Sequence, residues 1–214
     1  MVVGYDMRFL SEDFAVAVAE VLAGNGITAY LAAAPAPTPV LSYAILPLRA
    51  AGGIWITASH NPKGYNGIKL CLAGAAPVGV DTGLQEIQEL AETGVEPHGE
   101  PGVVSQIDPL RGYVDHLLSI VDPEKISALR VAADGGNGVA GVAVPDVFAR
   151  IPAQLTGLYL EPDGAFPNHH PDPLRSENLA DLDADAVEGT AGVYAAFDQA
   201  RRRHNLDGLA VRCW

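Results

Sequence analysis

Short apolar runs rich in β-branched residues alternate along the chain with longer stretches in which apolar residues recur at helical spacing. A short run predicts a buried strand, and recurrence every three or four residues predicts a helix with one face on a core. The pattern predicts strands at residues 1–6, 27–32, 53–57, 68–72, 130–133, 155–160 and 193–197. It predicts helices at residues 12–24, 81–93, 110–121 and 177–187, and further helical stretches before Pro47 and within 129–149. Strands that alternate with helices are typical of α/β folds with mostly parallel sheets.

The first predicted helix has recognisable start and stop signals. Ser11 is a good N-cap residue, because its side-chain oxygen can accept a hydrogen bond from a free backbone N–H group in the first turn. Gly24 and Gly26 are typical stop signals. We expect the core-facing stripe of this helix to consist of Phe14, Val18, Val21 and Leu22.

Residues 94–109 are rich in proline and glycine and show little periodicity, which predicts a linker. We therefore place a domain boundary near residue 108, with one domain at 1–108 and a second at 109–214. The strand and helix pattern repeats on both sides of this boundary. Each half is expected to be a three-layer α/β/α domain with a mostly parallel, mixed sheet.

Composition and charge narrow the choice of partners. The chain has 49% hydrophobic residues and a net charge of −13. Proteins bind nucleic acid and anionic membranes through clustered Lys and Arg, and this chain is strongly negative instead. Neither is therefore expected as a partner. The only cysteines, Cys71 and Cys213, are too few for a disulfide framework and are expected to be free thiols. No apolar run is long enough to cross a bilayer and the N-terminus does not resemble a signal peptide, which predicts a cytoplasmic protein.

The most informative segment follows the predicted strand at 53–57. There Ser59 comes at a strand-to-loop turn, followed by His60 and a stretch rich in Gly, Pro and Asn. Backbone N–H groups in an irregular loop of this kind can face an anion. His60 and Lys69 add donors able to steady phosphate charge or to move a proton. From spacing alone, the segment also fits an ordinary polar surface turn.

The run from Thr57 to Lys69, with Ser-His-Asn-Pro at 59–62, closely resembles the active-site signature of the α-D-phosphohexomutases, the family of phosphoglucomutases and phosphomannomutases. The resemblance covers about residues 2–198, which are similar to domains I and II of that family. It implies that Ser59 carries phosphate as phosphoserine, beside His60, and that Lys69 transfers a proton or contacts phosphate. Residues 4–8 resemble the first-domain strand and turn, where Arg8 would support the active-site loop. The implied substrates are a hexose phosphate and a hexose bisphosphate.

Two segments of the second half allow other interpretations. Gly136, Gly138 and Gly141 fit the dinucleotide-binding pattern G-x-G-x-x-G after an apolar strand, with Glu161 20 residues beyond, which would suit an NAD(P)-dependent dehydrogenase. A lone glycine motif is weak, and residues 134–141 also resemble the opening of phosphohexomutase domain II. In residues 161–173, His169 and His170 with nearby carboxylates could ligate zinc or manganese. The resemblance implies instead that this loop is structural and packs at the domain boundary.

The resemblance ends in the segment where the family has its metal loop. In the family, three carboxylates hold Mg²⁺ beside the phosphoserine, so Ser59 and Asp198 are the metal ligands implied here. Three arginines at 201–203 stand where carboxylates are expected. Positive charge at these positions would repel the cation. These features suggest a truncated or frame-shifted phosphohexomutase without domains III and IV. We expect negligible mutase turnover from it, and the alternative is a non-catalytic remnant that binds phosphosugars.

Overall fold

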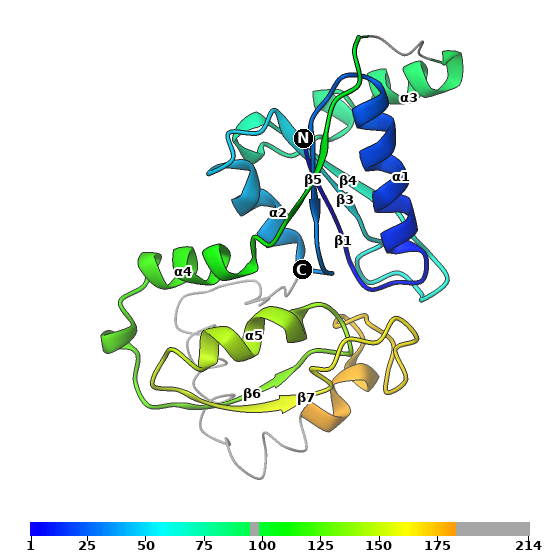
Figure 1. Cartoon of the computed structure of the whole chain (residues 1–214). Coiled ribbons are helices and arrows are strands. Elements are labelled where there is room, and N and C mark those ends of the chain that lie inside the picture. The colour runs from blue at the N-terminus through cyan, green and yellow to red at the C-terminus, as the bar shows by residue number, and fades with distance from the viewer. Residues whose placement is uncertain (95–98, 183–214) are drawn as a thin grey trace.

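The computed structural model describes residues 1–94 and 99–182, which form two α/β parts (Figure 1). The first part contains a five-stranded sheet in the order β4-β3-β1-β2-β5. Its strands are β1 (Val2–Tyr5), β2 (Ala29–Ala32), β3 (Gly52–Ile56), β4 (Ile68–Leu72) and β5 (Val104–Ile107). All neighbouring pairs are parallel except β3 and β4. The expected α/β class with a mostly parallel, mixed sheet is confirmed.

Helices cover both faces of this sheet. Successive residues of a strand point to opposite faces, so each central strand buries side chains on both sides. Val2 belongs to the core cluster formed with α2 (Thr38–Ile45), whereas Val3 belongs to the cluster formed with α1 (Ser11–Gly24). Figure 1 shows the two helices on opposite sides of the strands. The first part therefore has the three layers that the sequence predicts.

The parallel pairing of β1 and β3 decides where their following loops lie. Tyr5, the last residue of β1, is paired in register with Ile56, the last residue of β3. The carboxyl ends of parallel strands lie at the same edge of a sheet, and this edge is the usual place for a binding site in α/β folds. The turn after β1 and the loop after β3 consequently meet, although about fifty residues of sequence separate them.

The start of α1 differs from the sequence prediction. Ser11 is the first residue of the helix, and no side chain caps the helix start. Leu10 precedes it with a φ of 62°, and the Ser11 hydroxyl donates to the Asp6 carboxylate at 2.8 Å. The predicted N-cap role of Ser11 is therefore wrong. Its side chain is used in a contact with the end of β1 instead.

The buried face of α1 agrees only in part with the predicted stripe. The helix buries its small residues Ser11, Ala15 and Ala19, while Phe14 is 46% exposed and Val21 is 64% exposed. Small residues allow the helix to approach the sheet closely. Of the predicted stripe, Val18 and Leu22 are half-buried and pack against the core cluster that contains Val3, as expected, whereas Phe14 and Val21 lie at the exposed side of the helix.

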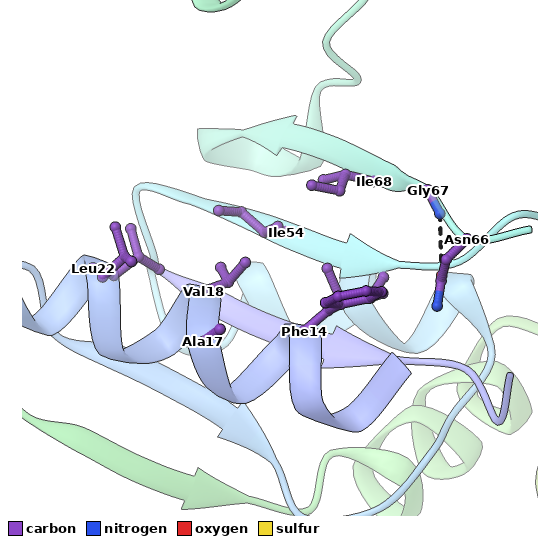
Figure 2. Close-up of a pocket in the computed structure, with 10 residues that line it drawn as sticks. Phe14, Ala17, Val18, Leu22, Ile54, Asn66, Gly67 and Ile68 are labelled. Carbon is purple, nitrogen blue, oxygen red and sulfur yellow. Dashed lines mark hydrogen bonds between the residues drawn. The ribbon is translucent and has the colours of Figure 1, made fainter. Parts of the chain in front are cut away.

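These larger side chains line an apolar groove of about 570 Å³ between α1, β3 and β4 (Figure 2). Phe14 and Val18 contribute from the helix, and Ile54 and Ile68 contribute from the strands. Ile68 is 60% exposed.

The predicted linker contains a strand that the sequence did not indicate. β5 pairs in parallel with β2 and completes the edge of the first sheet. It follows α3 (Leu84–Thr93), which begins after a short 3-10 turn at Val80–Thr82. Residues 104–107 of the predicted linker are thus part of the first sheet. The boundary near residue 108 stays a prediction.

The second part contains a two-stranded parallel sheet formed by β6 (Arg130–Asp134) and β7 (Gln154–Leu158). Helix α5 (Ala140–Phe148) connects the two strands, and α4 (Leu110–Ile120) connects the two parts. A 3-10 turn at Ser176–Leu179 lies where the helix at 177–187 was expected to begin. The strand predicted at 193–197 lies outside the described residues. Within the described ranges, no helix is long and apolar enough to span a membrane.

Candidate active site

The loop after β3 places Ser59 in an unusual backbone conformation. Ser59 has a φ of 55°, in the left-handed region that residues other than glycine seldom occupy. Side chains of the turn stabilise this conformation. Thr57 Oγ1 accepts a hydrogen bond from the Ser59 N–H at 3.1 Å, and the Asn61 side-chain amide donates one to the Ala58 carbonyl at 2.9 Å. Strained residues of this kind persist where the surroundings fix them, and they gather at functional sites.

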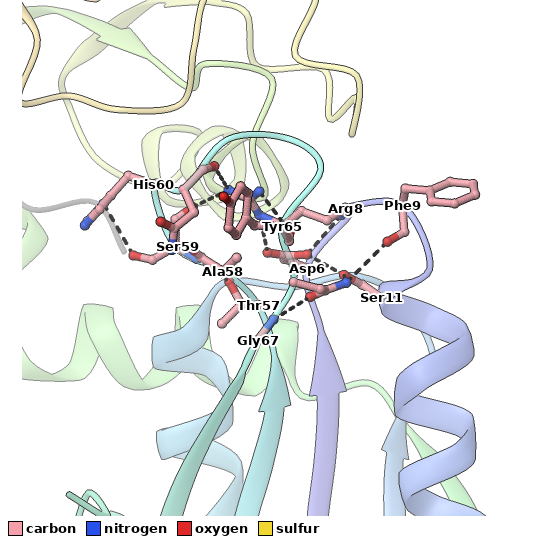
Figure 3. A network of polar contacts seen from close by, with 12 residues as sticks. Asp6, Arg8, Phe9, Ser11, Thr57, Ala58, Ser59, His60, Tyr65 and Gly67 are labelled. Atoms are coloured by element: carbon pink, nitrogen blue, oxygen red, sulfur yellow. Dashed lines mark hydrogen bonds and ion pairs between the residues drawn. The ribbon is translucent and has the colours of Figure 1, made fainter. Parts of the chain in front are cut away.

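Arg8 fixes the loop from the turn after β1 (Figure 3). Its side chain is only 1% exposed, and its guanidinium donates hydrogen bonds to four backbone carbonyls of the loop. The acceptors are Ser59 at 2.6 Å, Asn61 at 2.8 Å, Pro62 at 2.9 Å and Tyr65 at 3.3 Å. Charge-assisted hydrogen bonds are stronger than neutral ones. The loop is therefore wrapped around one buried cation, which is the supporting role predicted for Arg8.

Asp6 holds Arg8 in place and was not recognised in the sequence as a site residue. Its Oδ2 lies 3.3 Å from Arg8 Nε, and its Oδ1 accepts from the Arg8 backbone N–H at 2.9 Å. Burial lowers the pKa of the Arg8 guanidinium, and the Asp6 carboxylate opposes that shift. The available signal was an acidic residue directly after a buried strand and two residues before a basic one. The Asp6 carboxylate therefore compensates the buried positive charge of the Arg8 guanidinium, which the loop surrounds.

Asn66 closes the far end of the same loop and was also missed. Its amide donates to the Phe9 carbonyl at 3.2 Å and to Ser11 Oγ at 3.0 Å, and its Oδ1 accepts from the Gly67 N–H at 3.1 Å. Both ends of the loop are consequently attached to the turn that carries Arg8.

His60 lies directly beside the serine hydroxyl. Its Nδ1 is 3.3 Å from Ser59 Oγ, and the direction of this hydrogen bond depends on the imidazole tautomer. His60 is exposed and Ser59 is half-buried, so both can meet a ligand from solvent. The structure thus brings together Arg8, Ser59 and His60, three of the four residues expected in the site.

Lys69, the fourth, lies on β4 opposite Trp55 of β3, one residue into the strand. Burial lowers the pKa of its ammonium group, while the charges of Asp6 and then Cys71 oppose the shift. Because Asp6 acts on both cations, Lys69 belongs to the same electrostatic neighbourhood as Arg8. A lysine with a lowered pKa is neutral at a lower pH than usual, which suits an amine that accepts a proton.

Competitive acylation with trace acetic anhydride can detect this shift. The reagent acylates only the neutral amine, so the pH midpoint of Lys69 labelling should lie below that of an unstructured lysine peptide added to the same tube. Peptide mass spectrometry of Lys69 across a pH series measures it. A midpoint equal to or above that of the peptide would contradict the lowered pKa.

Comparisons with known proteins support the family interpretation. Residues 1–98 match the family model of phosphoglucomutase/phosphomannomutase alpha/beta/alpha domain I, and residues 111–203 match that of domain II. The chain belongs to this family. A phosphomannomutase from Escherichia coli is 40% identical over 208 residues. A phosphomannomutase/phosphoglucomutase from Pseudomonas aeruginosa is 40% identical over 162 residues, or 76% of this chain and 34% of the relative.

A solved structure agrees with the sequence matches. A phosphoglucomutase/phosphomannomutase family protein from Burkholderia thailandensis superposes with a TM-score of 0.70 at 30% identity, covering 86% of this chain and 41% of that one. The Escherichia coli match covers 92% of this chain and 45% of the relative. The chain therefore spans slightly less than half the length of that curated relative.

The described residues do not complete a magnesium site for the phosphohexomutase reaction. Of the two implied ligands, Asp198 lies outside the described residues, and Ser59 Oγ is hydrogen-bonded to His60. Within 1–94 and 99–182, no three His, Cys, Asp or Glu side chains are grouped as metal ligands. The sequence after Asp198 adds arginines rather than the oxygen ligands that Mg²⁺ prefers. We therefore derive no chemical step through a metal ion.

The glycine motif of the second part is used for packing rather than for a dinucleotide. A dinucleotide site needs free backbone N–H groups for the pyrophosphate. Here the Gly136 N–H donates to Asp134 Oδ1 at 2.7 Å, and the Asn137 N–H donates to the Tyr159 carbonyl at 2.8 Å. The Gly138 N–H donates to the Gly135 carbonyl at 2.8 Å. These donors are occupied within the fold, as expected for a domain II turn.

Of the two histidines considered as metal ligands, His169 is engaged within the fold. His169 has both ring nitrogens in hydrogen bonds, with Nε2 3.0 Å from Asp134 Oδ2 and Nδ1 3.0 Å from the His170 carbonyl. A ring nitrogen engaged in this way is not available as a ligand. These contacts fit the structural role that the family resemblance implies for this loop.

Proposed function

We propose that Ser59 is the phosphoryl carrier of a phosphohexomutase reaction on hexose phosphates. The observation that supports this most directly is the attachment of the Ser59 loop to Arg8. One buried guanidinium binds four carbonyls of the loop and holds Ser59 in a left-handed conformation beside His60. A carrier serine needs this kind of fixed position, because phosphoryl transfer depends mostly on positioning and charge stabilisation.

The proposed reaction has two transfers. Phosphoserine gives its phosphoryl group to a free hydroxyl of a hexose phosphate, so the bond from phosphorus to Ser59 Oγ breaks and a bond to the sugar oxygen forms. The hydroxyl proton leaves to a base, and the product is a hexose bisphosphate. In the second transfer, the bond from the other phosphorus to its sugar oxygen breaks and a bond to Ser59 Oγ forms; the serine hydroxyl loses its proton, and the released sugar oxygen takes up the proton held by the base. The net result is movement of phosphate between two sugar positions.

We assign Lys69 as the group that accepts and returns the proton, because its place in the family signature implies this role and burial shifts its pKa in the direction that a proton acceptor needs. We assign His60 as the hydrogen-bond donor to Ser59 Oγ as the phosphoryl group leaves, because its Nδ1 lies 3.3 Å from that oxygen. Arg8 is assigned a positioning role, since its guanidinium N–H groups are occupied by carbonyls.

Phosphoryl uptake from a hexose bisphosphate tests the assignment directly. The full chain is incubated with glucose 1,6-bisphosphate and, separately, with mannose 1,6-bisphosphate, and intact mass spectrometry measures the gain of one phosphoryl group. We expect uptake located by peptide mapping to Ser59 and complete loss of uptake in Ser59→Ala. Ser119→Ala is the matched control, because Ser119 lies on helix α4, outside the loop, where its hydroxyl donates to the His116 carbonyl.

The outcomes separate the two functions considered for this site. Binding of the bisphosphate in calorimetry without any mass gain would replace the carrier role by phosphosugar binding alone. Uptake that persists in Ser59→Ala would refute the assignment of Ser59.

A further inference from the structure

A loop of the second part lies directly against the Arg8 turn. A Cβ atom on Gly164 would come within 2.2 Å of the Met7 carbonyl oxygen, so the backbones meet with no room for a side chain. Two residues later, the Phe166 ring lies over the Arg8 guanidinium, 5.2 Å from Cζ to the ring centroid. Both contacts join segments more than 150 residues apart in sequence.

The loop is built to present this ring. Asp163 Oδ1 accepts from the Ala165 N–H at 2.8 Å, and the Phe166 N–H donates to the Asp163 carbonyl at 2.9 Å. This tight turn holds Phe166 at a φ of 48°. A bulky residue in the left-handed region is a conformational outlier, and such strain persists where the surroundings fix it.

The turn is also anchored to the second part. The Asp163 N–H donates to the Asn137 carbonyl at 2.8 Å, and the Asn137 amide donates to the Glu161 carbonyl at 2.9 Å. Asn137 is buried and itself has a φ of 56°. The position of the Phe166 ring therefore depends on the fold around β6 and α5.

The hydrogen bonds of Arg8 leave the face of its guanidinium plane available to the Phe166 ring. The N–H groups of a guanidinium lie at the edge of its plane, and here they bind the four loop carbonyls and Asp6. The face of the plane has no donor, and an aromatic ring attracts a cation there. Phe166 consequently covers Arg8 without competing for its hydrogen bonds.

We propose that Phe166 is a positioning residue for Ser59 that acts through Arg8. The second part thereby helps to set the geometry of a loop that belongs entirely to the first part. The catalytic consequence rests on the proposed function, whereas the structural coupling does not. Loss of the ring should loosen the guanidinium and hence the loop that it holds.

Amide hydrogen exchange of the full chain tests the coupling. The reporters are the Asn61 and Tyr65 amides, which donate to the Ala58 and Pro62 carbonyls inside the loop. We expect Phe166→Leu, which keeps an apolar side chain without an aromatic face, to speed their exchange about threefold to tenfold. Phe166→Tyr keeps the face and should restore the wild-type rate. Leu174→Ala is the control, because Leu174 is a nearby apolar residue that is 79% exposed.

A second variant approaches the contact from the backbone. Gly164→Ala should push the turn away from Met7 and speed exchange at the same two amides. Unchanged exchange in both Phe166→Leu and Gly164→Ala would overturn the inference, as would equal acceleration in Phe166→Tyr and Phe166→Leu. If Phe166→Leu does not fold, Phe166→Met takes its place in the comparison.

Phosphoryl uptake separates this inference from the proposed function. If wild-type chain takes up phosphate from the bisphosphate, Phe166→Leu should slow uptake severalfold and Phe166→Tyr should restore it. A wild type that takes up none removes the proposed function, and the exchange rates still decide whether Phe166 holds Arg8.

Discussion

Replacing Arg8 by methionine is expected to lower the free energy of unfolding by about 3 to 5 kcal/mol, the usual cost of removing one partner from a buried ion pair. Methionine has a similar length but no charge and no donor. The substitution leaves the Asp6 carboxylate uncompensated and removes the hydrogen bonds to four loop carbonyls. Urea denaturation followed by circular dichroism measures the loss. Amide hydrogen exchange should show that the loss of stability is located in the first part.

Two variants make the Arg8 experiment decisive. Arg111→Met removes a guanidinium from the exposed surface of α4 and should change stability by less than about 0.5 kcal/mol. Asp6→Asn combined with Arg8→Met removes the uncompensated charge and should recover part of the loss. Equal effects of Arg8→Met and Arg111→Met would contradict the role of Arg8 as the centre of the loop.

The second large effect is expected from Gly141→Ala. A Cβ at Gly141 would lie 1.6 Å from the Leu160 carbonyl oxygen, a backbone atom that cannot rotate away. Alanine in place of a helix glycine gains about 1 kcal/mol of propensity, but overpacking against backbone costs about 3 kcal/mol or more. The steric clash should therefore outweigh the gain in helix propensity, and helix α5 should be displaced from the loop after β7. Faster amide exchange in β6 and β7 would report this destabilisation of the second part.

Gly24→Ala is the matched control, because it makes the same exchange at the end of α1 with no atom within 4 Å of the added Cβ. It should leave stability unchanged or raise it by up to about 1 kcal/mol. A Gly141→Ala variant as stable as Gly24→Ala would show that α5 has space at Leu160 after all.

The sequence predicted the strands well where side chains alternate between two buried faces. It predicted α1 and two of its core-packed residues, Val18 and Leu22, but it missed the small residues that are fully buried against the sheet. Ala15 and Ala19 give a weak hydrophobic signal, whereas Phe14 and Val21 give a strong one and lie exposed. The strand β5 was missed because it lies at a sheet edge and is held by backbone pairing with β2.

The site was predictable to the extent that it lies in one continuous segment. Ser59 and His60 follow each other in sequence, and their surroundings resemble a known signature. Asp6 left only a local signal, an acidic residue two positions before Arg8, and Phe166 left none, because its role consists of a contact with Arg8. The fold alone brings Phe166 to Arg8.

The way in which Arg8 recognises the loop has a consequence for how this site can change over evolutionary time. Its guanidinium binds main-chain oxygens, which every amino acid possesses, and ignores the side chains that the loop presents. A substitution at an exposed position such as Lys63 can thus change the side chain that a ligand meets while the turn keeps its shape. The contacts that fix the backbone of the loop are thus separate from the exposed side chains that meet a ligand. This makes the loop a suitable place to introduce new reactivity by design.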